Sequence, residues 1–324
     1  MIRKLFSMLL CAFALLLLMG AGTVSELKQP AIILAEEESV PLSNGGALEP
    51  VSAMPELFAE QVVPATASAS PLNLAKMTES GLLVDGVHAP AEVALSRQDG
   101  VTYVALAAMA QVMDENANIS WNGSSGVATV ITPQLNLSAK VGQVYLEANG
   151  RYLYVPETVQ MVQGRVVVPL WALAKAFDAQ LGWDSTAGIV TVTRGSGGIA
   201  SGEAYYDETE LFWLSRVIYA ESGNQPLKGK MAVGNVVMNR VASPIYPNTV
   251  EDVLAQKNQF TTYKSGALAN RTPNEGSVIA AKLVLDGGVV AETAGALYFD
   301  SASNSWAARN KEFITVIGNH KFYR

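Results

Sequence analysis

Hydrophobic and polar residues follow different patterns along this chain, and the patterns divide it into segments. Residues 5–19 are an apolar run broken only by Ser7, whereas residues 26–80 are rich in Ala, Pro, Ser and Glu and show no sustained period. Residues 81–194 contain short stretches of alternating apolar and polar residues, as in strands with one buried face. After residue 207, apolar residues recur at spacings of three and four, which is typical of amphipathic helices. We expect an α+β protein in which a strand-containing region precedes a mainly helical one.

The start of the chain predicts export. Arg3 and Lys4 precede the apolar run, and the small residues Gly20, Ala21 and Gly22 follow it, where a signal peptidase would cut. The run is shorter than the roughly 20 apolar residues that a membrane-spanning helix needs. We therefore predict a signal peptide at residues 1–25 and a secreted protein, with an uncleaved N-terminal anchor as the alternative. Residues 26–80 lack the apolar content of a packed core and are predicted to be a disordered linker.

An internal repeat occupies residues 81–194. Residues 100–106 return as residues 164–170, with glycine first and leucine last in both copies. Each copy continues with a short apolar helix, a tryptophan and an alternating strand. In the first copy these are residues 107–113, Trp121 and residues 127–130. In the second copy they are residues 171–177, Trp183 and residues 189–192. We expect both tryptophans to be core residues, because each falls where a returning strand must cover the helix; carbohydrate platforms are the alternative.

The repeat resembles the copper amine oxidase N-terminal-like stalk domain found on many exported bacterial proteins. The motif G-x-x-x-V-P-L, complete only in the second copy, and the W-D/N turn carry the resemblance. His88 is the one histidine in the region and there is no cysteine, so an ordinary soft-ligand copper site cannot form there. The resemblance implies a spacer or cell-wall-associating module. The run Gly-Ser-Gly-Gly within residues 195–206 predicts a flexible linker after this stalk domain.

A helix predicted from Asp207 to about Ser222 places a carboxylate in an apolar stripe. Leu211, Leu214 and Ile218 recur at helical spacing, and the next position on that stripe is Glu221. An ionised carboxylate is costly to bury, so such a residue either forms an ion pair or takes part in the protein's chemistry. The first interpretation is a structural ion pair with one of two nearby cations, Arg240 or Arg216. The second is a general acid whose pKa is raised by apolar surroundings, as in glycosidases.

Further motifs follow in a fixed order. They are Y-A-E-S-G at 219–223, G-x-M-A-V-G-N-V-V-M-N-R-V at 229–241, P-I-Y-P-N-T-V at 244–250, Q-F-T at 259–261, G-A-L-Y-F at 295–299, S-W at 305–306 and I-G-x-H-x-F at 317–322. In that order they resemble the spore cortex-lytic, cell-wall hydrolase family from Leu211 to Phe322, within a catalytic domain predicted at residues 207–324. The resemblance implies a lysozyme-like fold, a small helical domain with a β excursion beside the cleft. It also makes Glu221 the match to the family's catalytic glutamate.

Six further residues are candidates for binding a glycan in that cleft. Ser222 adjoins the acid, where its hydroxyl would hold the carboxyl group. The other five come from the later motifs: Asn239, Phe260, Thr261, Tyr298 and Trp306. Simpler alternatives stand beside three of them, namely a satisfied polar residue at a helix end for Asn239, a core plug for Phe260 and the cap of a buried gap for Tyr298. His320, flanked by Asn319 and Lys321, is expected to be structural.

Charge and residue content exclude several classes of function. The net charge of −7 argues against nucleic acid as a partner, because phosphate binding needs a basic face. The single cysteine, Cys11, lies in the apolar run, so the mature chain has no disulfide. No His, Asp or Glu cluster has metal-ligand spacing, and no Ser/His/Asp or Cys/His pairing supports an amidase or peptidase. We expect no metal and no cofactor; the sequence gives no indication of oligomeric state.

The remaining acidic residues favour a single-acid mechanism. Glu251, Asp252, Glu275 and Asp286 all lie at helix ends and are explained as caps, whereas glycoside hydrolysis normally uses two carboxylates. Glu221 would protonate the glycosidic oxygen and then act as base on the sugar's own 6-hydroxyl, as in a lytic transglycosylase. The expected substrate is the peptidoglycan glycan strand, in spore cortex or vegetative wall. The alternatives are a hydrolysing muramidase or glucosaminidase, and a non-catalytic wall-binding protein.

Overall fold

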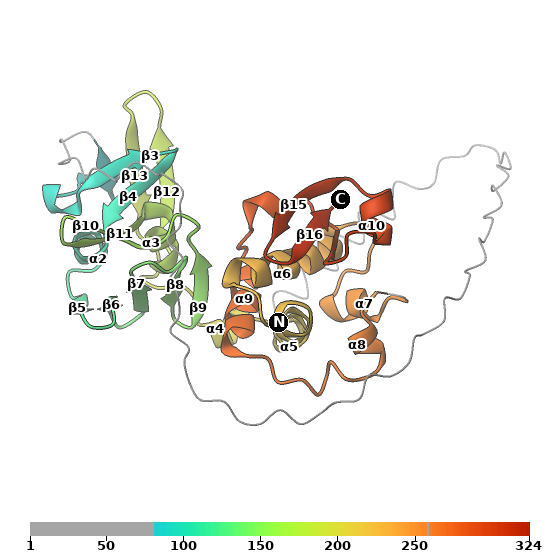
Figure 1. Cartoon of the computed structure of the whole chain (residues 1–324). Helices are drawn as coiled ribbons and strands as arrows, with labels where there is room; N and C mark the ends of the chain where they lie inside the picture. The colour runs from blue at the N-terminus through green and yellow to red at the C-terminus, as the bar shows by residue number, and fades with distance from the viewer. Residues whose placement is uncertain (1–80, 258) are drawn as a thin grey trace, which may run out of the picture. The chain divides into compact units, whose positions relative to one another are not determined.

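The computed structural model describes residues 81–257 and 259–324 (Figure 1). The predicted signal peptide and the predicted linker at residues 26–80 lie outside the described residues. Within the described ranges, no helix is both long enough and apolar enough to cross a membrane. By their contacts, the described residues all belong to one unit.

Three sheets, two short α-helices and a 3₁₀ helix, η1 (Ala91–Val93), build the stalk domain. One sheet has the strand order β12-β13-β1-β2, with β1 at Leu82–Val84, β2 at Val87–His88, β12 at Gln180–Asp184 and β13 at Ile189–Thr193. A second has the order β10-β11-β4-β3, with β3 at Leu95–Gln98, β4 at Val101–Ala105, β10 at Gln160–Val162 and β11 at Arg165–Pro169. The third has five antiparallel strands in sequence order, β5 at Asn118–Asn122, β6 at Val127–Ile131, β7 at Asn136–Lys140, β8 at Tyr145–Ala148 and β9 at Arg151–Tyr154.

The predicted repeat has a matching order of elements in the structure. Strand β4, helix α2 (Leu106–Met113) and the β5–β6 hairpin form the first copy, and β11, helix α3 (Leu170–Ala176) and the β12–β13 hairpin form the second. Strands β4 and β11 pair antiparallel, with Val104 opposite Val168. Helix α2 contacts β11, and α3 contacts β4. Each copy therefore completes its core with the strand of the other, as an approximate two-fold arrangement requires.

The two repeat tryptophans are not core residues, and that prediction is wrong. Trp121 is 48% exposed and Trp183 is 54% exposed. Both lie on edge strands, β5 and β12, whose residues mostly face solvent. The neighbouring strands β6 and β13 supply the buried side chains instead, and these pack against the helices. The returning strand does cover the helix, but it is the second strand of each hairpin, not the one that carries the tryptophan.

Residues 195–206 are packed against the stalk domain, which corrects the expected flexible linker. Ile199 is buried in the stalk core, and its carbonyl oxygen accepts a hydrogen bond of 2.8 Å from Asn149 Nδ2. A Cβ atom on Gly195 would overlap the carbonyl oxygen of Asp178, and one on Gly198 would overlap that of Gln134. These glycines therefore permit close backbone approach, whereas their composition alone suggested a mobile joint. The segment ends in the single turn α4 (Gly202–Tyr205).

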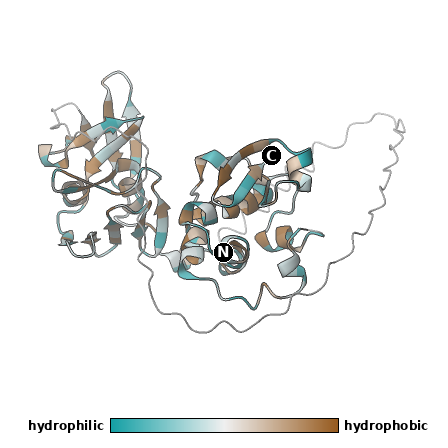
Figure 2. Ribbon diagram, in the orientation of Figure 1, coloured by the Kyte–Doolittle hydropathy of each residue, from teal (hydrophilic) through white to brown (hydrophobic). Residues whose placement is uncertain are grey.

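The C-terminal region consists of helices around one core and a small sheet. Its helices are α5 (Glu208–Ser222), α6 (Leu227–Ala242), α7 (Val250–Ala255), α8 (Thr261–Lys264), α9 (Glu275–Leu285) and α10 (Trp306–Asn310). A three-stranded antiparallel sheet has the order β14-β16-β15, with β14 at Tyr298–Asp300, β15 at Phe313–Ile317 and β16 at His320–Tyr323. Its helices carry both hydrophobic and hydrophilic residues (Figure 2). The chain is thus mixed α+β as predicted; the lysozyme-like character stays a prediction.

Helices α5, α6 and α9 meet at a glycine. A Cβ atom on Gly234 of α6 would lie 2.9 Å from Cδ1 of Ile218 in α5 and 3.2 Å from Cγ2 of Val284 in α9. All three residues belong to, or adjoin, the buried core of the region. Glycine lets the three helices approach closely there, and this fixes the position of the last turn of α5.

Asp286 is the C-cap residue of α9, as expected, and it also joins the two regions through an ion network. Its carboxylate pairs with Arg151 of β9 through two hydrogen bonds of 2.8 Å, and with Lys175 of α3 at 2.6 Å. Tyr206 donates a further hydrogen bond of 3.3 Å. Burial alone would raise the pKa of Asp286, but the hydrogen bonds and charges of the two cations together hold it below its ordinary value. The partners are 135 and 111 residues away in sequence, so local patterns predicted the cap but not the ion network.

Candidate active site

Glu221 lies in the last turn of α5, on the face that packs into the core. The helix begins after Asp207, whose side chain accepts hydrogen bonds from the backbone N–H groups of Thr209 and Glu210, and it ends before Gly223. Leu214 and Ile218, which precede Glu221 on the same face, are completely buried. The predicted helix and its stripe are thus confirmed at these positions, and a rigid, well-capped helix holds the carboxylate.

The Glu221 carboxyl group has no fixed partner. It is partly buried, and none of the residues that the structure describes forms a hydrogen bond or an ion pair with it. Burial raises its pKa above the ordinary value, and the charge of Arg271 opposes this only in part. A carboxyl group in such surroundings holds its proton to higher pH than an exposed one does. This is the state that a general acid requires.

The two cations named in the ion-pair interpretation are engaged elsewhere. Arg240 donates to the carbonyl oxygen of Leu297 and to Oε1 of Gln259, each within 2.9 Å. Arg216 donates to the carbonyl oxygens of Phe212 and Ala269. Neither guanidinium forms an ion pair with Glu221. The structure therefore favours the general-acid interpretation over the structural ion pair.

Three of the expected substrate-binding residues have structural contacts instead. Ser222 is completely buried, and its hydroxyl donates a 2.8 Å hydrogen bond to the carbonyl oxygen of Ile218, so it does not hold the Glu221 carboxyl group as expected. Asn239 donates from Nδ2 to the carbonyl oxygen of Ala296 at 2.9 Å. Phe260 is 7% exposed and packs in the core, as a plug would. For Asn239 and Phe260 the simpler alternatives describe what the structure shows.

Of the remaining candidates, Thr261 and Trp306 are exposed and Tyr298 is half-buried. Thr261 begins α8 and its side chain is exposed. Trp306 begins α10 and is 56% exposed, and its ring lies 5.8 Å from that of Tyr298 on β14. The Tyr298 hydroxyl lies 3.1 Å from that of Tyr246, and this hydrogen bond, with help from nearby cations, lowers the pKa of Tyr298. None of the hydrogen bonds or ring contacts of these residues reaches Glu221.

Two cations complete this aromatic group, and sequence reasoning missed their contribution. Lys311 Nζ lies 4.6 Å from the ring centroid of Tyr298 and 5.3 Å from that of Trp306. The buried Arg240 guanidinium lies 5.6 Å from the Tyr298 ring and 5.3 Å from the Tyr246 ring. Tyr246 stood in a recognised motif, but nothing in the local sequence marked Lys311. Flat aromatic faces beside cations suit a sugar that carries an acidic group.

His320 is packed as a structural residue. Its side chain is buried, its ring lies 5.4 Å from that of Phe299, and burial lowers its pKa. In the parts of the chain that the structure describes, no three His, Cys, Asp or Glu side chains are grouped as a metal site would need.

Comparison with known proteins confirms both resemblances. Residues 224–323 match the Cell Wall Hydrolase family, a range that begins just after Glu221, and residues 83–192 match the Copper amine oxidase N-terminal domain. The spore cortex-lytic enzyme of Bacillus cereus is 35% identical over 121 residues, which cover 36% of this chain and 45% of the relative. That of Bacillus subtilis (strain 168) is 29% identical over 120 residues, which cover 36% and 38%.

Two solved structures are also similar to part of this chain. The catalytic domain of the germination-specific lytic transglycosylase SleB from Bacillus anthracis is 30% identical, with a TM-score of 0.33, and the match covers 39% of this chain and 100% of that one. The catalytic domain of the Bacillus cereus SleB protein is also 30% identical, with the same TM-score and 40% of this chain covered. The chain spans less than half the length of the curated relatives it matches.

Proposed function

We propose that this chain is an exported peptidoglycan lytic transglycosylase in which Glu221 is both acid and base. The observation that carries the proposal is the Glu221 carboxyl group, partly buried on a capped helix, without a bonded partner among the described residues and with a raised pKa. The match to the Cell Wall Hydrolase family and the name of the relatives, spore cortex-lytic enzyme, support the substrate. We take the glycan strand of spore cortex as the first substrate to test.

One carboxyl group suffices for the proposed reaction. The Glu221 proton passes to the glycosidic oxygen as the bond from C1 of the muramic acid residue to that oxygen breaks. The 6-hydroxyl oxygen of the same sugar then bonds to C1, and its proton passes to the Glu221 carboxylate. The products are a free 4-hydroxyl and a 1,6-anhydro end, and Glu221 is protonated again. Intramolecular attack replaces the activated water that a second carboxylate would have to supply.

The aromatic group around Trp306 is the proposed sugar subsite. Trp306, which is 56% exposed, is assigned the stacking contact, and Lys311, which lies over the Tyr298 ring, supplies a positive charge next to it. The proposal assigns Thr261 a place on the same substrate path, because its hydroxyl is exposed at the start of α8. The proposal gives a structural role, and no contact with substrate, to three of the original candidates: Ser222, Asn239 and Phe260.

The mass of the released fragments tests the reaction type. Mature protein incubated with purified cortex and with vegetative sacculi should release muropeptides whose reducing ends are one water lighter than hydrolysis products. Fragments of full mass would instead identify a hydrolase that activates water. Intact sacculi after prolonged incubation with folded protein would favour a non-catalytic wall-binding protein.

The pH dependence of cleavage should follow Glu221. Because the acid must be protonated and burial raises its pKa, kcat/KM should fall as pH rises through that raised value. Arg271 lowers the pKa of Glu221, so the Arg271→Gln variant should move this alkaline limb to higher pH. Arg216→Gln is the matched control, since Arg216 lies on the same helix but does not shift the Glu221 pKa. An alkaline limb that stays in place in Arg271→Gln would contradict the assignment.

A further inference from the structure

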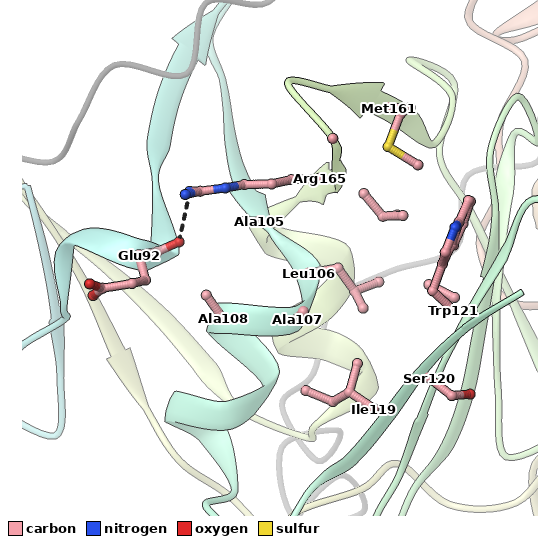
Figure 3. A pocket seen from close by; sticks show the side chains of 13 residues that line it. Glu92, Ala105, Leu106, Ala107, Ala108, Ile119, Ser120, Trp121, Met161 and Arg165 are labelled. Carbon is pink, nitrogen blue, oxygen red and sulfur yellow. Dashed lines mark hydrogen bonds between the residues drawn. The ribbon is translucent and has the colours of Figure 1, made fainter. Parts of the chain in front are cut away.

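A pocket of about 400 Å³ opens on the stalk domain, away from Glu221 in the sequence and in its contacts (Figure 3). It lies between the start of α2, strand β5 and the β10–β11 hairpin. Trp121 and Met161 border it on one side, and Arg165 enters from another, as Figure 3 shows. Both Trp121 and Met161 are substantially exposed, at 48% and 41%. The pocket thus presents mainly apolar surface, and its lining also includes one cation, Arg165, and one acidic residue, Glu92.

Small side chains create the hollow. The chain places alanine at four lining positions, Ala105, Ala107, Ala108 and Ala128. Trp121 stands at the edge with its ring free, because none of the described residues stacks on it or covers it with a cation. The Arg165 guanidinium makes one hydrogen bond, of 3.2 Å from Nη1 to the carbonyl oxygen of Glu92, and has no ion pair among the described residues. Its charge therefore remains available to a ligand.

The equivalent positions in the second copy of the repeat carry different residues. In the register of the repeat, Trp171 stands where the first copy has Ala107. Arg97 takes the position of Met161, because Arg97 pairs with Thr102 as Met161 pairs with Val166.

The substitutions close the second site. The Arg97 guanidinium lies 4.5 Å from the centroid of the Trp183 ring and is fixed by a 3.2 Å hydrogen bond to the carbonyl oxygen of Gly188. The cation of the first site is also missing, since Val101 matches Arg165. One copy of the repeat thus combines an uncovered tryptophan, Ala107 at the pocket and the cation of Arg165, whereas the other copy has a covered tryptophan, Trp171 and Val101 at these places.

We propose that this pocket binds an acidic, N-acetylated sugar unit of a peptidoglycan glycan strand. Trp121 would stack on the sugar ring, the alanine floor would receive the acetyl methyl group, and Arg165 would pair with a carboxylate of the muramic acid substituent. The identity of the ligand rests on the proposed function, and the charge of Arg165 complements the carboxylates of that polymer. A second binding site on the same chain would raise the local concentration of the strand at the enzyme.

The test compares binding by repeat-related variants of the full mature chain. The probe is a peptide-free tetrasaccharide of alternating N-acetylglucosamine and N-acetylmuramic acid, titrated by calorimetry below the temperature of rapid cleavage. Trp121→Ala and Ala107→Trp should each weaken binding at one site about tenfold. The second variant installs the residue that the other repeat already has, at an exposed position, so folding should be retained. Trp183→Ala, whose ring Arg97 covers, is the matched control and should bind within twofold of wild type.

Two further comparisons identify the group that Arg165 binds and distinguish binding at this pocket from the proposed reaction at Glu221. Arg165→Met should weaken binding of the muramic-acid tetrasaccharide but not of an N-acetylglucosamine tetramer of equal length. Unchanged binding in Trp121→Ala, or binding of the isolated stem peptide and not of the glycan, would overturn the inference. Cleavage of the tetrasaccharide should be unaffected by Trp121→Ala. If the wild-type protein fails to cleave the glycan, that result contradicts the proposed function alone. If Trp121→Ala binds the tetrasaccharide as tightly as wild type, that result contradicts the proposed stalk-domain site alone.

Discussion

An Asp286→Ala variant should be destabilised by about 3 kcal/mol, the loss expected when one partner of a buried ion pair is removed. The Asp286 side chain is 1% exposed and that of Arg151 is 8% exposed, so the substitution leaves a guanidinium buried without its counter-charge. For a domain of this size the melting temperature should fall by roughly 6 to 12 °C. Thermal unfolding followed by circular dichroism measures the change.

The pH dependence of stability gives an independent check. The pKa of Asp286 in the folded protein lies below its ordinary value, so the unfolded chain binds the proton more readily. The network therefore stabilises the protein fully above the pKa of the unfolded state, and this contribution is lost as pH falls through the lower, folded value. The difference in melting temperature between wild type and Asp286→Ala should accordingly shrink in acid.

An exposed ion pair in the same region provides the control. Lys228 and Glu292 lie 2.6 Å apart with side chains about half exposed, and such pairs contribute less than about 1 kcal/mol. Glu292→Ala should therefore change the melting temperature far less. Equal effects of the two variants would contradict a buried network at Asp286. A truncated chain that starts at Gly202 would lack Arg151 and Lys175, the two cations that pair with Asp286. The ion network therefore makes the stalk domain part of the stable folded unit.

Features set by neighbouring residues were predictable from the sequence. The helix expected from Asp207 to Ser222 is observed at Glu208–Ser222, because the capping side chain and the closing glycine lie beside it in the chain. The order of elements in the repeat follows from alternation over a few residues, and the fully buried Leu214 and Ile218 follow from helical spacing.

Features that depend on distant partners were not predictable. Trp121 and Trp183 are exposed because β5 and β12 lie at sheet edges, and strand order is a property of the whole fold. Asp286 lies 135 positions after Arg151 in the chain, so the two meet only when the chain between them is folded. The glycines of residues 195–206 looked like a flexible linker until the backbone they pack against was in place. Lys311 had no local signal, since its role comes from two rings that other elements supply.

Glu221→Gln should lower cleavage by roughly 10²- to 10⁴-fold, the usual effect of losing a general acid. Glutamine keeps the size of the side chain and removes its titratable proton. The loss should exceed that range if the same group also acts as base in the second step. No described residue is bonded to the carboxyl group, so the substitution leaves no donor or cation without a partner.

The Glu221→Gln substitution should not lower the free energy of unfolding, although it lowers the rate of cleavage. Burial raises the pKa of Glu221, so the folded protein binds this proton more tightly than the unfolded chain does. Wild type therefore loses stability as pH rises from the unfolded to the folded pKa, and above the latter the loss is complete. The Glu221→Gln variant lacks this loss and should be as stable as wild type, or more stable, at neutral pH.

The most direct measurement is the rate of sacculus lysis and the melting temperature of Glu221→Gln and wild type, on the same preparations at neutral pH. If Glu221 is the catalytic acid, lysis by the variant falls at least a hundredfold while its melting temperature equals or exceeds that of wild type. If Glu221 is instead one half of a structural ion pair, the variant is destabilised by about 3 kcal/mol and still lyses sacculi wherever it remains folded. A destabilised but active Glu221→Gln protein would contradict the proposed mechanism.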